Sequence, residues 1–157
     1  MMRYRLMLTV AAIVAAVNAL TQLVAVALSH WRGPVFLPGG WALQVVHNNG
    51  VIGGVGAGTI APDVFAIGAA LQIAVLTYVT RHQRGRLWAV ALGLILGAAI
   101  GNEGESRLFG YIVDWVWPPH MRLAFNLADV AVACGEALMI TLLVHARKVS
   151  DRVVVAQ

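Results

Sequence analysis

The sequence has few charged residues and almost no cysteine. Of its 157 residues, 11% are charged and 60% are hydrophobic, whereas about a quarter of the residues in a typical soluble domain are charged. One cysteine, Cys134, cannot form an internal disulfide, and no Cys/His cluster indicates zinc or an iron–sulfur centre. We expect Cys134 to pack as a small apolar residue inside a helix. The composition therefore excludes an ordinary soluble domain and a small fold held by disulfides or zinc.

Long apolar runs account for most of the chain. The mean hydropathy is +0.79, and a transmembrane helix needs about 20 mostly apolar residues. The runs predict an all-α membrane protein, a single domain over residues 1–157, with spans at about 7–28, 64–80, 87–101 and 125–144. A cleaved signal peptide is the competing interpretation of the first run, but that run exceeds the 7–15-residue core of such a signal.

The basic residues give a net charge of +4 and a pI near 10. A basic chain can bind nucleic acid, but these residues cluster at alternate ends of successive apolar runs, which is the positive-inside pattern. The pattern predicts that both termini lie in the cytoplasm. The clusters are Arg3 and Arg5, then Arg81, Arg84 and Arg86, then Arg147, Lys148 and Arg152.

The segment between the first two runs, residues 29–62, has no helical pattern and is interrupted by proline and glycine. Residues 42–46 form a short extended run, and residues 47–50 offer a turn. Four glycines between residues 53 and 58 resemble a phosphate loop only weakly, because no strand and helix frame them. We expect a short sheet at the outer face of the membrane.

Polar residues within the runs mark helix contacts and a candidate site. Asn18 and Gln22 share one helical face and predict interhelical hydrogen bonds. Asp114 and Asp129 lie where the third and fourth runs meet the aqueous edge, and a carboxylate there is costly unless paired, hydrogen-bonded or wet. Together they suggest a carboxylate dyad. The alternative for Asp129 is a helix cap or a partner for Arg122.

Four segments resemble the motifs of one membrane peptidase family, the lipoprotein signal peptidases, also called signal peptidase II. Asn48-Asn49-Gly50 resembles the family's Asn-x-Gly segment, and Gly101-Asn102 opens what resembles its Gly-Asn-x-x-Asp-Arg segment. Residues 110–115, Gly-Tyr-Ile-Val-Asp-Trp, resemble its Gly-x-Val-Val-Asp-Phe segment. Residues 125–129, Phe-Asn-Leu-Ala-Asp, match its Phe-Asn-x-Ala-Asp segment without a gap. The spacings agree, and the resemblance extends over all four runs.

The resemblance implies an aspartic endopeptidase of the bacterial cytoplasmic membrane that cuts lipid-modified prolipoproteins without a metal or cofactor. It implies that Asp114 and Asp129 are the catalytic pair. The implied fold is a four-transmembrane-helix bundle with a small extracytoplasmic β-cradle and a short surface helix, which we place between Asp114 and Asn126. We expect a monomer with its site near the extracytoplasmic face. The residues expected to bind substrate are Asn48, Gly50, Asn102, Glu105 and Asn126.

The chain departs from the family pattern at several positions. The family usually has an Asp and, four residues later, a Lys in the first span, where this chain has Asn18 and Gln22. Its Asp-Arg is here Glu105-Ser106, and the Ala-Phe after Asn-x-Gly is Ile52-Gly53. Glu136 has no family role, and we consider a structural hydrogen bond to Asn18 or Gln22. These departures leave two alternatives open: a catalytically silent paralogue that binds lipoproteins or modulates a true peptidase, and a proton-coupled channel.

Overall fold

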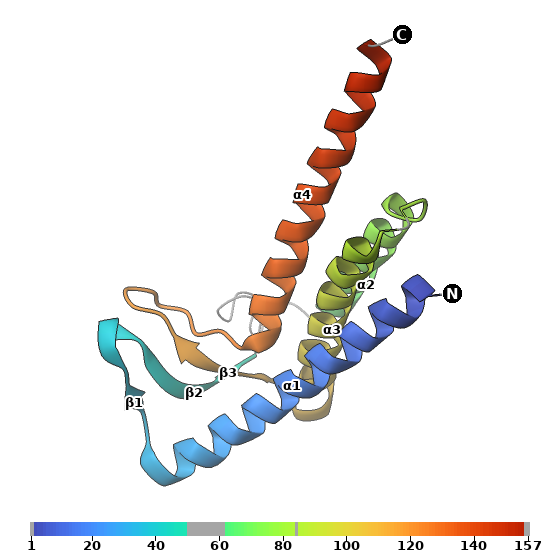
Figure 1. The fold of residues 1–157 in the computed structure, drawn as a ribbon. Helices are drawn as coiled ribbons and strands as arrows, with labels where there is room; N and C mark the ends of the chain where they lie inside the picture. The colour runs from blue at the N-terminus through green and yellow to red at the C-terminus, as the bar shows by residue number, and fades with distance from the viewer. Residues whose placement is uncertain (1, 50–61, 84, 156–157) are drawn as a thin grey trace.

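A computed structural model describes residues 2–49, 62–83 and 85–155 of the chain. Figure 1 shows the helices as a splayed bundle, with a small sheet beside the C-terminal half of the first helix. The elements in chain order are α1 (Met2–Arg32), β1 (Val35–Phe36), the 3-10 turn η1 (Pro38–Gly40), β2 (Ala42–Asn48), α2 (Pro62–Val79), α3 (Arg86–Phe109), β3 (Ile112–Trp117) and α4 (Leu127–Val155).

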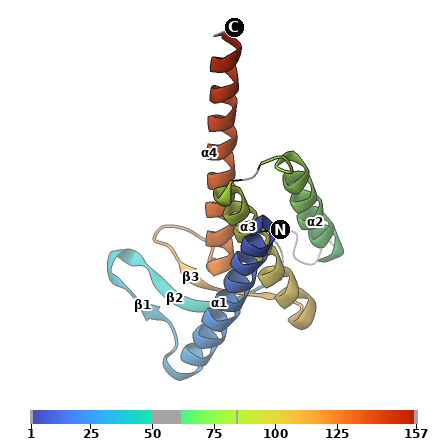
Figure 2. The same cartoon turned by 45° about the vertical axis from the view of Figure 1, so that its right-hand side comes forward.

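Helix α3 lies at the centre of the bundle and packs against the other three helices. Its glycines explain how closely α1 approaches, because a Cβ on Gly97 would lie 2.6 Å from the carbonyl oxygen of Ala11 and 2.7 Å from Cβ of Val14. Gly93 and Gly101 lie against α1 in the same way. The spacing of these three glycines, four residues apart, predicts a closely packed neighbouring helix, and that neighbour is α1. In contrast, α2 stands beside α3 and apart from the sheet (Figure 2).

The sheet joins two distant parts of the chain. Its order is β1-β2-β3 with antiparallel pairing, and β2 pairs with β3 so that Val46 lies opposite Asp114 and Asn48 opposite Ile112. The expected extended run at 42–46 is confirmed, but the strand continues through Asn48 instead of turning at residue 47. Pairing with β3 extends the strand, and the local sequence carried no sign of that partner.

The described helices fit a membrane protein. Three of them, Arg3–Arg32, Arg86–Phe109 and Leu127–Arg147, are long and apolar enough to cross a bilayer, while the described apolar part of α2, Ala66–Val79, is shorter. Large apolar side chains remain exposed along the bundle, as expected for a surface that contacts lipid. Examples are Leu20, Leu23, Ile67, Leu71, Val75 and Ile140.

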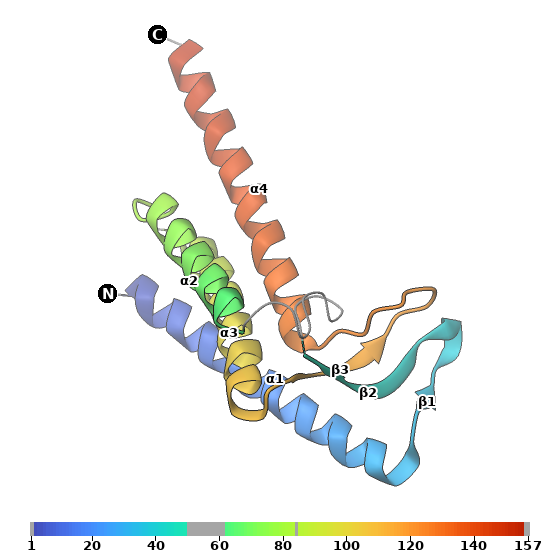
Figure 3. The same ribbon diagram turned by 180° about the vertical axis from the view of Figure 1, so that it is seen from behind.

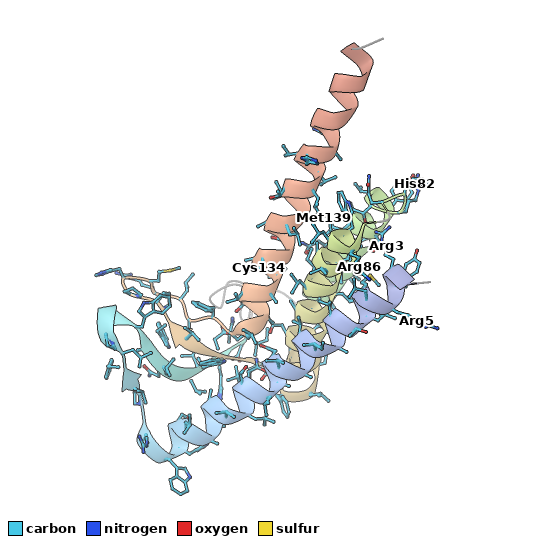
Figure 4. The ribbon with its side chains drawn as sticks, in the orientation of Figure 1. Arg3, Arg5, His82, Arg86, Cys134 and Met139 are labelled. Carbon is cyan, nitrogen blue, oxygen red and sulfur yellow. The ribbon has the colours of Figure 1, made fainter. Side chains whose placement is uncertain are left out.

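Basic side chains gather at the end of the bundle that lies away from the sheet. Figure 4 places Arg3, Arg5, His82 and Arg86 together there, near the N-terminus and the turn between α2 and α3. Arg3 donates hydrogen bonds to the carbonyl oxygen of Gln83 and, at 3.3 Å, to the hydroxyl of Thr80. The predicted clustering of charge thus also ties α1 to the α2–α3 turn.

Three expectations from the sequence are wrong. The sequence after the third run predicts a solvated or Arg-paired loop for Glu103 and Glu105, but α3 continues to Phe109 and both residues are helical. The pairing with arginine is present, because Glu103 contacts Arg107 four residues later. The short surface helix is absent from residues 118–126, where Pro118 and Pro119 interrupt the chain and Phe125 pairs with β3 instead. Cys134 is exposed on α4 and is not packed inside the bundle.

The contact between α1 and α3 leads to a stability prediction. Gly97→Ala should lower the free energy of unfolding by about 1–3 kcal/mol, because the added methyl overlaps the backbone of α1. Gly104→Ala is the matched control on the same helix, since a Cβ there meets nothing within 4 Å and alanine favours helix. Thermal unfolding of both variants in detergent tests this. Equal stability of the two would contradict the proposed packing.

Candidate active site

Two carboxyl groups meet where β3 passes the base of α4. Asp114 lies in the middle of β3 with 3% of its surface exposed, and Asp129 is the third residue of α4 and half-buried. Seen from behind, β3 leaves the end of α3 and runs past the first turn of α4 (Figure 3). The strand and the helix therefore bring together two aspartates that are 15 positions apart in the chain.

Asn126 links the two aspartates. Its side-chain amide nitrogen donates to Oδ1 of Asp114 at 2.8 Å and to Oδ1 of Asn102 at 3.1 Å, and no part of Asn126 is exposed. Asn102 in turn donates to Oδ1 of Asp129 at 3.2 Å. A buried polar network is stabilising only when its members are satisfied, and the polar atoms of Asn126 have partners here.

Asn126 and Asp129 also form a capping box at the start of α4. Oδ2 of Asp129 accepts from the backbone N–H of Asn126 at 2.9 Å, and Oδ1 of Asn126 accepts from the backbone N–H of Asp129 at 3.2 Å. This reciprocal pairing satisfies two N–H groups at the helix terminus. Asp129 is thus a helix cap, as the simpler interpretation of the sequence held. The cap fixes its orientation and leaves it in contact with the network.

The structure brings together most of the residues expected to bind substrate. Asn48, at the end of β2, donates to Oδ2 of Asp114 at 2.9 Å. Asn102 and Asn126 hold the carboxyl groups as described. Glu105 lies beside this network and accepts a hydrogen bond from Gln22 at 2.7 Å. Gly50, which was also expected here, falls outside the described residues.

The surroundings of Asp114 favour its protonated form. Burial raises the pKa of Asp114 from 3.8 to about 6, and the negative charge of Asp129 adds to this, while hydrogen bonds from Asn48 and Asn126 oppose it. Two neighbouring carboxyl groups cannot both ionise cheaply. The pair can therefore hold one proton up to about pH 6, which is the state that general acid–base chemistry requires.

Glu136 has a different partner from the one considered. It accepts a hydrogen bond from Gln72 of α2 at 2.5 Å, and not from Asn18 or Gln22. Gln72 was the one interior polar residue of the second run, and this could have indicated the pairing. Among the residues described, no group of three or more metal-ligating side chains occurs.

An apolar cavity of about 250 Å³ lies between α1 and the sheet. Val24, Leu28, Leu43 and Trp115 are among the side chains that line it, and neither aspartate does. Successive strand residues point to opposite faces, so Trp115 and Asp114 face opposite sides of β3. The cavity is separate from the carboxyl pair.

Comparisons with known proteins found one matching family. The family model of signal peptidase (SPase) II matches residues 10–145. A lipoprotein signal peptidase of Streptomyces coelicolor is 37% identical over 130 residues, which are 77% of this chain and 61% of that protein, so the match spans less than two thirds of its length. One of Streptomyces griseus is 32% identical over 145 residues, 87% of this chain and 71% of that protein.

A solved structure shares the fold. It is a bacterial membrane enzyme determined by the in meso method at 2.3 Å resolution, with a TM-score of 0.76 and 21% sequence identity. The match covers 88% of this chain and 87% of that one. The arrangement of helices and sheet is therefore one that a known membrane enzyme adopts.

The raised pKa of Asp114 predicts that the protein loses stability as the pH rises. An unfolded aspartate releases its proton near 3.8 and the folded one near 6, so between these values the folded state binds more protons and the free energy of unfolding falls. In Asp114→Asn, this fall in the free energy of unfolding should be smaller by on the order of 2 kcal/mol. Unfolding measured from pH 4 to 8 tests it, with Glu103→Gln as the control that should behave like the parent. An unchanged slope in Asp114→Asn would contradict the burial argument.

Proposed function

This chain belongs to the signal peptidase II family, and from that membership we propose that it is an intramembrane aspartic endopeptidase that removes the signal peptide from lipid-modified prolipoproteins. The observation that carries the proposal is the pair Asp114 and Asp129, joined through Asn126 and Asn102. The pair is formed from two of the segments that resemble the family's motifs. Two neighbouring carboxyl groups that share one proton can act as an acid and a base.

The chemistry needs one proton on the pair. The ionised carboxyl group takes a proton from a bound water, whose oxygen attacks the scissile carbonyl carbon while the protonated carboxyl group polarises the carbonyl oxygen. The tetrahedral intermediate then collapses, the carbon–nitrogen bond breaks, and the leaving nitrogen receives a proton from the pair. No covalent enzyme intermediate forms. The two apparent pKa values belong to the pair as a whole.

The bundle gives this chemistry a membrane setting. We propose that all four helices span the bacterial cytoplasmic membrane with both termini in the cytoplasm, which the basic end near Arg3 and Arg86 supports. The sheet and the aspartates lie toward the opposite end, which we assign to the extracytoplasmic face. A substrate anchored by its own apolar segment reaches a site at that depth. We propose that the chain acts as a monomer, and that Asn48, Gly50, Asn102, Glu105 and Asn126 bind substrate or shape its site.

A catalytically silent relative that binds lipoproteins or modulates a true peptidase is the second candidate. Its support is the pair Asn18 and Gln22, which are neutral where the family usually has an Asp and a Lys. Glu136, which suggested a proton pathway, is hydrogen-bonded to Gln72, and this contact gives it a structural role. The carboxyl pair is more readily explained by hydrolysis than by binding alone.

Cleavage of a lipidated prolipoprotein by the purified protein, followed by gel shift, tests the proposal. We expect the parent to cleave, and Asp114→Asn and Asp129→Asn to lower the rate at least 1,000-fold, because each removes a carboxyl group that the proton transfers require. Glu103→Gln is the matched control, since Glu103 pairs with Arg107 at 2.7 Å away from the site, and it should cleave like the parent.

Two results would contradict the peptidase assignment. Normal cleavage by both aspartate variants would show that the pair is not catalytic. Binding of prolipoprotein without cleavage, beside an active signal peptidase as positive control, would favour the silent relative.

A further inference from the structure

Two side chains of α1 contact the backbone immediately before each aspartate. Oδ1 of Asn18 accepts from the backbone N–H of Ala128 at 3.0 Å, and Nε2 of Gln22 donates to the carbonyl oxygen of Val113 at 3.1 Å. Ala128 precedes Asp129, and Val113 precedes Asp114. One face of a single helix therefore holds both chain segments that carry the carboxyl pair.

The contact at Val113 involves three residues, which are Val113 itself, Gln22 and Glu105. Gln22 donates both to the Val113 carbonyl oxygen and to Oε2 of Glu105, at 3.1 and 2.7 Å, and Glu105 also hydrogen-bonds the backbone of Val113. The backbone of Val113 is thus held from α1 and from α3 together. Val113 and Gln22 are both about 5% exposed. Hydrogen bonds excluded from water and assisted by a charged carboxylate are stronger than ordinary ones.

The contact at Ala128 adds to the cap of α4. The N–H groups of the first helical turn have no partner within the helix, and Asn18 supplies one for Ala128 from a different helix. Asn18 is fully buried, and it lies directly against Gly101 of α3. A larger residue than glycine at position 101 would push the amide of Asn18 away from α4. The glycine face of α3 is therefore what lets Asn18 reach the start of α4.

We propose that Asn18 and Gln22 are positioning residues that set the distance between the two carboxyl groups. Four residues of helix rise about 6 Å, so the two amides act as fixed points about 6 Å apart on one rigid element. A dyad with a water between its carboxyl groups needs its separation held to within a fraction of an ångström. The inference rests on the proposed peptidase function for its catalytic meaning, but the anchoring itself does not.

The neutral character of the two residues fits this role. Each contacts the backbone next to one aspartate with a neutral amide group, so neither side chain adds a buried ion beside the carboxyl pair. A cation at position 22 would still have the donor that Val113 and Glu105 require. An aspartate at position 18 would still have the acceptor that Ala128 requires. Asn18→Asp and Gln22→Lys therefore keep the hydrogen-bonding atom while they change the charge of the side chain.

Steady-state cleavage kinetics test the proposal with paired variants. Asn18→Leu and Gln22→Met keep size and remove the hydrogen bonds, and we expect kcat to fall 10- to 100-fold with KM changed less than threefold, since small misplacements of reacting groups cost about this much. Asn18→Asp and Gln22→Lys keep the bonding atom and should retain kcat within about threefold. The double variant Asn18→Leu/Gln22→Met should lose less than the product of the single losses, because both anchors serve one distance.

A second measurement does not depend on activity. Carbon-13 NMR of labelled aspartate, with Asp114→Asn to assign the signal, reports how Asp114 titrates. We expect the midpoint to move from about 6 toward its ordinary value in the two apolar variants. In the two conservative variants the new charge acts instead, so the midpoint should rise in Asn18→Asp and fall in Gln22→Lys. Should an apolar variant fail to fold, Asn18→Ser or Gln22→Ser, which are too short to reach, replaces it with the same expectation.

The outcomes separate the two proposals. Unchanged kcat and unchanged Asp114 titration in folded Asn18→Leu and Gln22→Met would overturn the positioning role while leaving the peptidase intact. A parent that never cleaves, combined with an Asp114 midpoint that falls in these variants but not in Asn18→Asp, would overturn the peptidase and support the anchoring. If the conservative variants lose as much kcat as the apolar ones, the positioning role is also overturned.

Discussion

The hydrogen bonds of Asn126 are the contact on which the rest of the site depends. This side chain caps α4 through the N–H of Asp129, and its amide nitrogen donates to Asp114 on β3. If it were lost, the first turn of α4 and the middle of β3 would each contain an unsatisfied buried group, which costs about 1–3 kcal/mol. One buried amide therefore fixes a helix terminus and joins it to a strand.

The glycines of α3 determine which helix can pack closely enough to reach the carboxyl pair. Because Gly93, Gly97 and Gly101 remove side chains from one face, α1 packs directly against the backbone of α3. This approach places the amides of α1 at the level of β3 and the start of α4. Helix packing in membranes relies on such small-residue faces, since lipid gives no hydrophobic drive for association. The same residues that hold the bundle together thus bring α1 to the carboxyl pair.

Much of this could be predicted from the sequence, and the failures have a common cause. The apolar runs, the basic clusters and the spacing of Asn18 and Gln22 are local patterns, so helices, a charged end and interhelical contacts followed from them. Pairing of β2 with β3 depends on chain segments some 70 residues apart, and neither segment shows it alone. The partner of Glu136 was missed although Gln72 was a visible candidate, because the relative rotation of α2 and α4 is set by packing and not by local sequence.

The direct hydrogen-bond partners of the carboxyl pair are neutral, and this bears on whether the chain can be active. Asp114 and Asp129 are contacted by asparagine amides, and among the described residues the ion pair recorded is Glu103 with Arg107, on the exposed side of α3. A cation against either aspartate would favour two ionised carboxylates and lower the pKa. Amides hold the geometry while the pair can still keep one proton. Neutral residues at positions 18 and 22 are therefore compatible with catalysis, since the dyad needs fixed geometry and a shared proton rather than a compensating charge.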